Sequence, residues 1–366
     1  MSRVRTLCLT LSIAAVAGCA TDTPEPVAPN SAVELSTHAN VESEDADGED
    51  RDGTYTFAVI GDTPYGAAKL AEFPSLVDKI NADDAVRLVA HLGVIKAGKN
   101  APCSDEYFAI VRAQFDRFAD PLVYTPGDNE WTDCHVAIKN NGLYTPTERL
   151  QKVRELFFPV PGRTLGGRAM HVLTQADDPA NSAYVENAIF RKKRVVLATL
   201  NITGSNNDGA SWGTPLPADA AAYPSQADER AARAQANEAW LNEAFATATR
   251  THAVGVVLLF QADMWDTAEP TLSGYDALVQ QIGTLAARYD GPVLLLEGDS
   301  HVFRVDNPYA ETSPLHALHP MTPVADNIIR IVVEGSDAGR TEYLRLTIDP
   351  KGKGRDLFTW TRVPLH

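Results

Sequence analysis

Short apolar runs alternate with helical stretches along this chain, and that alternation restricts the fold more than any other feature of the sequence. The apolar runs are rich in β-branched residues, and most of them stop at glycine or at a polar residue. They span residues 54–60, 87–92, 121–125, 193–200, 253–260 and 292–297, with helical patterns at 67–81, 104–118, 225–250 and 272–289. This order predicts an α/β layered domain. Three further strand-like runs after residue 327 predict an antiparallel set at the C-terminal end.

Polar residues collect where the predicted strands end. The first strand is followed by Asp62, the third by Asp128, and the run at 292–297 by Asp299 and His301. In α/β sheets, ligands bind beyond the carboxyl ends of strands, where loops from several strands meet. The sequence therefore predicts one metal or phosphate site at this edge.

Five short blocks at these strand ends, in this order, resemble the motifs of the calcineurin-like metallophosphoesterases. The blocks are Asp62-Thr-Pro64, Gly93-Val94, Gly127-Asp-Asn-Glu130, Gln261-Ala-Asp263 and Gly298-Asp-Ser-His301. The resemblance covers about residues 54–333 and implies a four-layer α/β/β/α sandwich with two metal ions. Two ions together stabilise the attacking and the leaving oxygen of a phosphoryl transfer.

Several positions depart from the family pattern. Pro64 and Gln261 each stand where the family has a histidine, Asp299 replaces the first histidine of the last block, and Asp128 and Asn129 replace Asn-His in the third. The exchange of imidazole for oxygen favours Mg²⁺, Mn²⁺ or Ca²⁺ over Zn²⁺. The fuller strings around these blocks resemble an exported bacterial branch of the family, in which such variants are the norm.

Val94 stands at the position where the family has the carboxylate that bridges both metals. Valine cannot bind a metal, and two cations a few ångströms apart repel each other without a bridging anion. We expect one or two ions. Because no carboxylate at position 94 can bridge a pair, a single ion is the simpler case. It would be held by four side chains: Asp62, Asp128, Asp299 and His301.

The resemblance also suggests roles for the neighbouring residues. Asn129, Asp128 and His301 are the candidate catalytic residues. Asn129, Lys96, Gln261 and Asn206 are the candidate substrate-binding residues. Simpler interpretations remain open: Asn129 suits an Asx turn, Lys96 a solvated loop, and Asp299 an outer carboxylate that orients His301. His91, one residue before the end of a buried strand, is typical of a hydrogen-bonded core histidine.

The N-terminus predicts export. Arg3 and Arg5 precede an apolar run at 7–17, which is shorter than a membrane span and is typical of a secretory signal. The run ends in Val-Ala-Gly-Cys19, which resembles the lipobox of bacterial lipoproteins. We expect cleavage there and a lipid on Cys19 that anchors the protein to a bacterial membrane, the outer membrane facing the periplasm being favoured. A short transmembrane anchor is the alternative.

The chain divides into three parts by composition. Residues 1–19 form the signal and lipobox, and residues 20–52 form an acidic tether with ten acidic residues and one basic residue. Such a segment, with three prolines and no aromatic residue, cannot form a packed core. Residues 53–366 carry all the strand and helix patterns and form the metallophosphoesterase-like domain.

Two cysteines remain once Cys8 of the signal and Cys19 are set aside. Cys103 and Cys134 are expected to form a disulfide in an oxidising compartment. A metal-binding pair is the alternative, but only His135 is adjacent to either cysteine. The disulfide would join the loops after the second and third strands.

These observations favour hydrolysis of small phosphate esters by a metal-dependent, membrane-anchored enzyme. A non-catalytic protein that binds a phosphorylated or anionic ligand at the same place is the alternative, because of Val94. A serine hydrolase is disfavoured because the chain has no Gly-x-Ser-x-Gly motif. The formal net charge of −16 disfavours nucleic acid as a partner.

Overall fold

The computed structural model describes residues 53–98, 101–136, 144–213 and 216–366. The chain separates into two units, Met1–Leu35 and Ser36–His366. Residues 1–52, which carry the predicted signal, Cys19 and the tether, lie outside the described residues. Everything below concerns the second unit.

The first sheet has five strands in the order β12-β11-β1-β2-β3. Strands β1, β2 and β3 run parallel, whereas β11 is antiparallel to both β1 and β12. The strands are β1 (Tyr55–Ile60), β2 (Val86–His91), β3 (Leu122–Tyr124), β11 (Glu342–Ile348) and β12 (Phe358–Pro364).

The second sheet has seven strands in the order β4-β5-β6-β7-β8-β10-β9. Its centre, β6-β7-β8-β10, is parallel, and antiparallel strands flank it on both sides. The strands are β4 (Leu173–Thr174), β5 (Ala188–Lys192), β6 (Val195–Thr199), β7 (Gly255–Leu259), β8 (Val293–Glu297), β9 (Arg304–Asp306) and β10 (Ile328–Val332).

In the described part of the chain, the α-helical segments that accompany the sheets are α2 (Gly66–Asn81), α3 (Asp105–Phe115), α5 (Pro146–Phe157), α6 (Gly204–Asp208), α7 (Gln226–Arg250) and α8 (Asp276–Ala286). Local sequence explains where two of them begin. The Ser104 side chain accepts a hydrogen bond from the Tyr107 N–H, and Ser225 accepts one from Asp228, as N-cap residues do.

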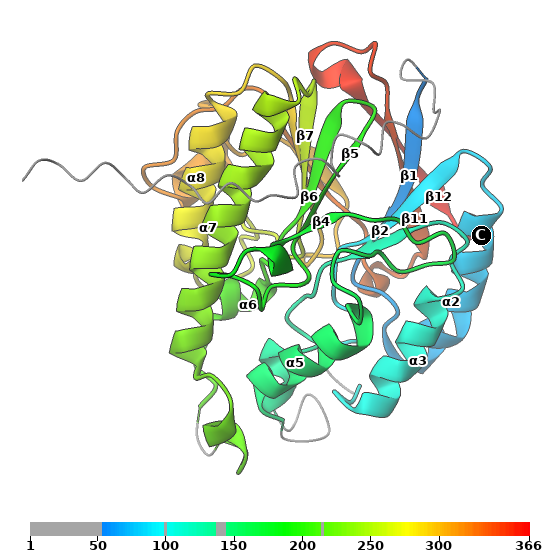
Figure 1. Cartoon of the computed structure of the whole chain (residues 1–366), viewed down its shortest axis with the longest axis vertical. Helices are drawn as coiled ribbons and strands as arrows, with labels where there is room; N and C mark the ends of the chain where they lie inside the picture. The colour runs from blue at the N-terminus through cyan, green and yellow to red at the C-terminus, as the bar shows by residue number, and fades with distance from the viewer. Residues whose placement is uncertain (1–52, 99–100, 137–143, 214–215) are drawn as a thin grey trace, which may run out of the picture. The chain divides into compact units, whose positions relative to one another are not determined.

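Three apolar clusters hold these elements together. One packs β1 and β2 against α2 and α3, and another packs β6, β7 and β8 against α7 and α8 (Figure 1). The remaining cluster combines residues of both sheets, such as Val59 and Leu346 of the first with Leu259 and Leu294 of the second. The predicted α/β class is confirmed as a mixed α/β structure with two sheets and helices.

The C-terminal strands differ from the prediction in one respect. Strands β11 and β12 form the expected antiparallel pair, but β10 belongs to the other sheet and runs parallel to β8. All five residues of β10 are buried, including Arg330, as is typical of a parallel strand with both faces covered. The sequence patterns also did not identify helix α5 or the short strands β4, β5 and β9.

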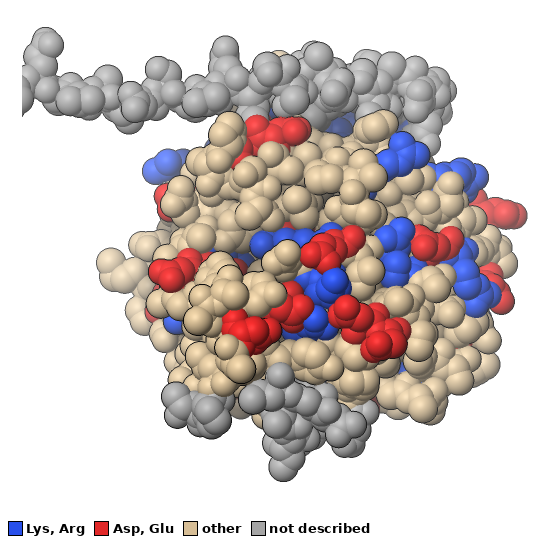
Figure 2. Space-filling view, turned by 60° about the horizontal axis from the view of Figure 1, so that its bottom comes forward, with Lys and Arg blue, Asp and Glu red and all other residues tan. Residues whose placement is uncertain are grey.

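Acidic and basic side chains lie next to one another on the face shown in Figure 2, with no patch of a single sign. No helix within the described residues is both long and apolar enough to span a bilayer.

Candidate functional site

The carboxyl ends of β1, β3 and β8 bring three acidic residues together. Asp62 follows β1, Asp128 follows β3 and Asp299 follows β8, each within four residues of its strand. Asp62 is fully buried and Asp128 almost so, whereas Asp299 is half-buried. The predicted meeting of strand ends from different parts of the chain is therefore present in the structure.

Asp62 lies at the centre of one half of this cluster. Its Oδ2 accepts a hydrogen bond of 2.9 Å from the Asp299 N–H. Its Oδ1 lies 3.4 Å from His301 Nε2. The other ring nitrogen of His301, Nδ1, lies 3.5 Å from Oδ2 of the exposed Asp337. His301 is thus between two carboxylates.

Asp128 and Asp299 approach each other at Gly204. A Cβ atom at Gly204 would lie 2.8 Å from both carboxylate oxygens of Asp299 and 3.0 Å from Cγ of Asp128. A residue larger than glycine at position 204 would therefore collide with the two carboxylates. The next residue, Ser205, donates a hydrogen bond of 2.8 Å to Asp128 Oδ2.

The backbone at these acids is held in an uncommon conformation. Asp62, Asp299 and His301 have φ values of 51°, 70° and 60°, which few non-glycine residues adopt. Hydrogen bonds fix this geometry: the Asp62 N–H donates to the Gly93 carbonyl, and the Asp62 carbonyl accepts from the Ser336 N–H, both at 2.9 Å. Local strain held by its surroundings in this way is common at functional sites.

The electrostatics of the cluster favour a cation. Burial, together with the charges of Asp133, Glu130 and Asp62, raises the pKa of Asp128 to about 8. Burial and the charges of Asp128 and Asp62 raise the pKa of Asp299 well above its usual range. Within the described residues, no Lys or Arg forms an ion pair with Asp62, Asp128 or Asp299. The basic group beside them is His301, 3.4 Å from Asp62.

His301 adds a nitrogen donor to this oxygen-rich set. Burial lowers the pKa of His301, but the hydrogen bond and charge of Asp62, with Asp337 and Asp128, raise it above its usual value overall. A buried set of carboxylates with one imidazole has the donor chemistry of a divalent cation site. The described part of the chain nevertheless contains no group of three His, Cys, Asp or Glu side chains placed to hold a metal ion. The cluster fits a cation in its chemistry, and the ion identity expected from the sequence stays a prediction.

Val94 lies at the position that the resemblance assigns to the bridging carboxylate. Its side chain is buried against Gly127, and its N–H donates a hydrogen bond of 3.0 Å to Glu130 Oε1. The same Glu130 oxygen accepts from the Gly127 N–H and from the Tyr124 hydroxyl, both at 2.7 Å. Glu130 thus joins the loop after β2 to the loop after β3 through hydrogen bonds to the Val94 and Gly127 N–H groups. The Val94 side chain packs against Gly127 between these loops.

Lys96 and Asn129 lie beside the cluster and contact each other. The Lys96 ammonium is buried and donates hydrogen bonds of 2.9 Å to the carbonyls of Ala97 and Asn129. With its amide turned so that both atoms find partners, Asn129 donates to Asp133 Oδ2 and accepts from the Gly98 N–H, each at 3.2 Å. In this structure both predicted substrate-binding residues hold loop segments, and their action on a substrate stays a prediction.

Gln261 and Asn206 lie on the Gly204 side of the cluster. Gln261 is fully buried, and its Oε1 accepts a hydrogen bond of 2.5 Å from the Gly204 N–H. Asn206 is half-buried, and its Oδ1 accepts from the Gly274 N–H at 2.7 Å. Gln261 therefore helps to place Gly204 against the carboxylates.

The predicted disulfide between Cys103 and Cys134 is present. Both sulfur atoms lie 3.6 Å from the carbonyl oxygen of Asn129. The bridge therefore joins the segment after β2 to the segment after β3 directly beside the cluster.

His91 is a hydrogen-bonded core residue, as expected. Its Nε2 donates to the Thr63 carbonyl at 2.8 Å and its Nδ1 accepts from the Gly93 N–H at 3.2 Å. Burial lowers its pKa to about 4, which keeps the ring neutral. His91 thus links the loop that carries Asp62 to the loop that carries Val94.

Three residues of the cluster were not identified from the sequence: Tyr65, Gly204 and Ser205. The Tyr65 hydroxyl lies 3.2 Å from His301 Nε2, although the two residues are 236 positions apart. Tyr65 ends the string Gly-Asp-Thr-Pro-Tyr, so its place directly after the Asp62 block was the available signal. Gly204 and Ser205 follow β6, but their link to Asp128 spans 77 positions and has no local signature.

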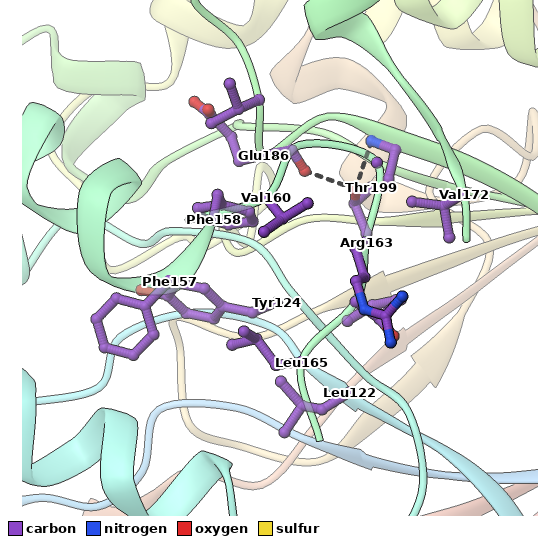
Figure 3. Close-up of a pocket in the computed structure, with 15 residues that line it drawn as sticks. Leu122, Tyr124, Phe157, Phe158, Val160, Arg163, Leu165, Val172, Glu186 and Thr199 are labelled. Carbon is purple, nitrogen blue, oxygen red and sulfur yellow. Dashed lines mark hydrogen bonds between the residues drawn. The ribbon is translucent and has the colours of Figure 1, made fainter. Parts of the chain in front are cut away.

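A separate pocket lies between β3, the end of α5 and strands β5 and β6. Most of its labelled lining residues, among them Tyr124, Phe157 and Phe158, are apolar or aromatic (Figure 3). It is a small cavity, with a volume of about 30 Å³. The pocket includes none of the clustered acids, so it is separate from the candidate site.

No protein-family model matches the sequence, and the search of curated proteins gives no significant match. The solved structures that resemble it include GAP50, the anchor in the inner membrane complex of Plasmodium, at 10% identity and a TM-score of 0.42, covering 86% of this chain and 89% of that one. They also include a 5′-nucleotidase from Candida albicans at 9% identity and a TM-score of 0.42, covering 85% of this chain. The match spans about half (51%) of that nucleotidase chain. Because both TM-scores lie below 0.5, the activity has to be inferred from the site itself.

Proposed function

We propose that this protein is a calcineurin-like phosphoesterase that hydrolyses small phosphate esters with a divalent cation. The observation that carries the proposal is the meeting of Asp62, Asp128 and Asp299 at the ends of strands from both sheets, without a Lys or Arg partner within the described residues. Crowded carboxylates at strand ends, with the pKa of Asp128 and Asp299 raised by burial and by one another's charge, are typical of a site that binds a cation.

The residues divide by role. Asp62, Asp128, Asp299 and His301 hold the cation, which when bound activates water and stabilises charge on the phosphoryl oxygens. Asn129 and Asn206 are half-exposed beside the acids and can hydrogen-bond a phosphate ester. Lys96 and Gln261 position the loops that carry these groups, through the Asn129 carbonyl and the Gly204 N–H. No side chain acts as a covalent nucleophile.

The proposal includes the four-layer α/β/β/α sandwich of this family. The three apolar clusters support it, because one lies between the sheets and each of the others packs helices against one sheet.

The test compares the native chain with Val94→Asp. Hydrolysis of a chromogenic phosphomonoester and diester is measured with added Mg²⁺, Mn²⁺, Ca²⁺ and Zn²⁺, and Asp128→Asn serves as the inactive control. We expect metal-dependent hydrolysis by the native chain and a larger rate in Val94→Asp, because an added carboxylate in the loop after β2, beside Glu130, can hold a second ion.

Each outcome decides something. Activity only in Val94→Asp means that the chain has lost the phosphoesterase activity of its ancestors. Absence of hydrolysis in both, with each variant folded, contradicts the proposal and favours an anion-binding protein. Activity that survives in Asp128→Asn contradicts the assignment of the site.

We further propose that Cys19 carries a lipid that anchors the protein to a bacterial membrane, the outer membrane on its periplasmic side. The support is the sequence of residues 1–19 and the acidic tether that follows. Cys19→Ser is expected to move the protein from the membrane fraction to the soluble periplasmic fraction, as measured by cell fractionation. Unchanged fractionation contradicts the anchor. The mixed charges in Figure 2 agree with a small ester rather than nucleic acid as the partner.

A further inference from the structure

One hairpin of the second sheet carries four consecutive basic residues. Strands β5 and β6 are antiparallel neighbours, and the chain between their paired parts reads Arg191-Lys192-Lys193-Arg194. The hairpin as a whole, residues 188–199, contains no acidic residue. Residues 191–194, here called the basic tip, are therefore a local concentration of positive charge in a chain of formal net charge −16.

The turn of the basic tip has a backbone conformation that long side chains rarely adopt. Lys192 pairs with Val195, so Lys193 and Arg194 form a two-residue loop. Their φ values are 51° and 62°. Two-residue hairpin loops with both φ values positive strongly prefer Asn-Gly or Asp-Gly, because other side chains crowd the backbone there. Two cations at these positions cost stability, and local strain of this kind is common at functional positions.

Two charges of the basic tip are accessible to a partner. Lys192 is half-buried and Arg194 is exposed, whereas Arg191 and Lys193 are mostly buried. Lys192 Nζ lies 5.8 Å from the centre of the Tyr55 ring. Within the ranges that the structure describes, no carboxylate forms an ion pair with Lys192 or Arg194.

The contact with Tyr55 places the basic tip beside the start of the first strand. Tyr55 is the first residue of β1. The residues just before it, 42–52, contain seven acidic residues and one basic residue, Arg51, and are here called the acidic segment. Its last acid, Asp52, is three residues from Tyr55, so the Cα atoms of the two residues are at most about 11 Å apart.

Charge and chain connection both favour the acidic segment as the partner of the basic tip. Opposite charges attract each other over a Debye length, which is about 8–10 Å at ordinary ionic strength. Because only Gly53 and Thr54 separate the acidic segment from Tyr55, the association is intramolecular and has a high effective concentration. An anionic lipid surface is the other candidate, and it has to compete with acids that the chain itself holds near the tip.

We propose that the acidic segment binds the basic tip of the same chain, with its carboxylates paired to Lys192 and Arg194. The tip lies at the amino ends of β1 and β6. The candidate site lies at their carboxyl ends, where Asp62 follows β1 and Gly204 follows β6. The bound segment therefore occupies the edge of the domain opposite to the candidate site. The interaction is independent of the proposed hydrolysis, because it uses none of the site residues.

The test uses the untagged full chain with Cys19→Ser, so that no lipid binds it to vesicles. A carbodiimide joins a lysine amine to a carboxylate in contact with it, and mass spectrometry identifies the amide cross-links. We expect cross-links from Lys192 or Lys193 to the acidic segment. They should form at about 0.01 M NaCl and be lost at about 1 M NaCl, where the Debye length falls from about 30 Å to about 3 Å.

Lys351 and Lys353 are the internal comparison for cross-linking. Both are exposed and follow β11, whose last residue, Ile348, pairs with Tyr55, so they lie near the same end of β1. An acidic segment without a preferred partner would react with these lysines as often as with the basic tip. We expect several-fold more cross-linking at the basic tip.

Limited proteolysis provides a second measurement. A Glu-specific protease cleaves at Glu49 in the acidic segment and at Glu34 before it, and cleavage of a bound segment proceeds through its unbound fraction. Relative to Glu34, cleavage at Glu49 should be at least about fivefold slower in the native tip than in Lys192→Glu/Arg194→Glu, which removes several ion pairs.

Arg230→Glu/Arg340→Glu is the matched control for charge. It makes the same change in net charge at a half-buried position of α7 and at an exposed position before β11. Protection of Glu49 should stay as in the native tip. Should Lys192→Glu/Arg194→Glu fail to fold, the salt dependence of the cross-links in the chain with a native tip decides the question.

Absence of cross-links between the acidic segment and the basic tip would overturn the inference, as would equal relative cleavage at Glu49 with the native and the reversed tip. Vesicles of phosphatidylglycerol, with phosphatidylcholine as the neutral comparison, test the lipid surface. Vesicle binding that requires Lys192 and Arg194, in a chain that forms no such cross-links, would make the tip a lipid-binding site and the inference wrong.

Discussion

Two groups of acids meet at the carboxyl end of β8, and they differ in their counter-charge. Asp299 belongs to the open cluster described above, whereas Glu297, two residues earlier, belongs to a closed network around Arg330. Arg330 lies 2.7 Å from both oxygens of Asp306 and 2.6 Å from Asp263 Oδ1. The closed network contains its own cation, and within the described residues the open cluster does not.

The presence or absence of a basic side chain beside the acids distinguishes a structural ion-pair network from a site that can bind a cation. A buried carboxylate is costly unless a partner neutralises it. In the closed network the guanidinium of Arg330, which also lies 5.1 Å from the Trp265 ring, supplies that partner permanently. In the open cluster, no Lys or Arg of the described residues pairs with Asp128 or Asp299, and burial among like charges raises the pKa of both. An open site of this kind is suited to a cation from outside.

The largest effect is expected from Arg330→Met. The substitution leaves Asp263 and Glu297 buried without their main cation, so the free energy of unfolding should fall by about 3–5 kcal/mol. Urea unfolding followed by circular dichroism measures it.

Arg304→Met is the matched control on the rim of the same network. Arg304 is partly exposed and reaches Asp263 Oδ2 at 3.3 Å, so its removal should cost at most about 1 kcal/mol. Equal losses in the two variants would contradict the closed-network interpretation.

A second effect concerns the pH dependence of the metal-free chain. The pKa of Asp128 rises from 3.8 to about 8 on folding, so the folded state binds more protons between these values. The stability contribution of this group is therefore present below about pH 4 and is lost as the pH rises through 8. Unfolding free energies measured from pH 5 to pH 8 in chelator should fall by an amount on the order of a few kcal/mol.

Asp128→Asn removes this titration and should flatten the curve while it raises stability at pH 8. A saturating divalent cation should have the same flattening effect on the native chain, because it neutralises the acids. If neither the Asp128→Asn substitution nor the added cation changed the dependence of stability on pH, folding would not raise the pKa of Asp128.

The sequence predicted the elements better than the contacts among them. Asp62, Asp128 and Asp299 could be found because each follows an apolar strand, and strand ends meet in a parallel sheet. The Cys103–Cys134 bridge followed from simple counting. The parallel partner of β10 could not be found, because an apolar run of five residues does not specify its neighbour.

The rest of the site depends on contacts between distant positions. Tyr65 meets His301 across 236 positions, and Arg330 meets Asp263 across 67. Such pairs have no local signature, since they are set by how the sheets pack. A motif comparison therefore finds the acids of the open cluster but not the tyrosine beside them, nor the arginine that neutralises the closed network.

The smallest effect, expected from Ser205→Ala, tests how the open cluster is held without a cation. The Ser205 hydroxyl is a donor to Asp128 Oδ2, at 2.8 Å, and its loss should raise the pKa of Asp128 further and cost about 1 kcal/mol at pH 8. Ser300→Ala is the control, because the Ser300 hydroxyl lies between Asp299 and His301 in sequence but makes no hydrogen bond within the described structure. Chemical unfolding of both variants in chelator measures the difference. A loss in Ser205→Ala that disappears when a divalent cation is added would show that hydroxyl and cation compensate the same charge, whereas a loss that persists would make Ser205 a purely structural residue.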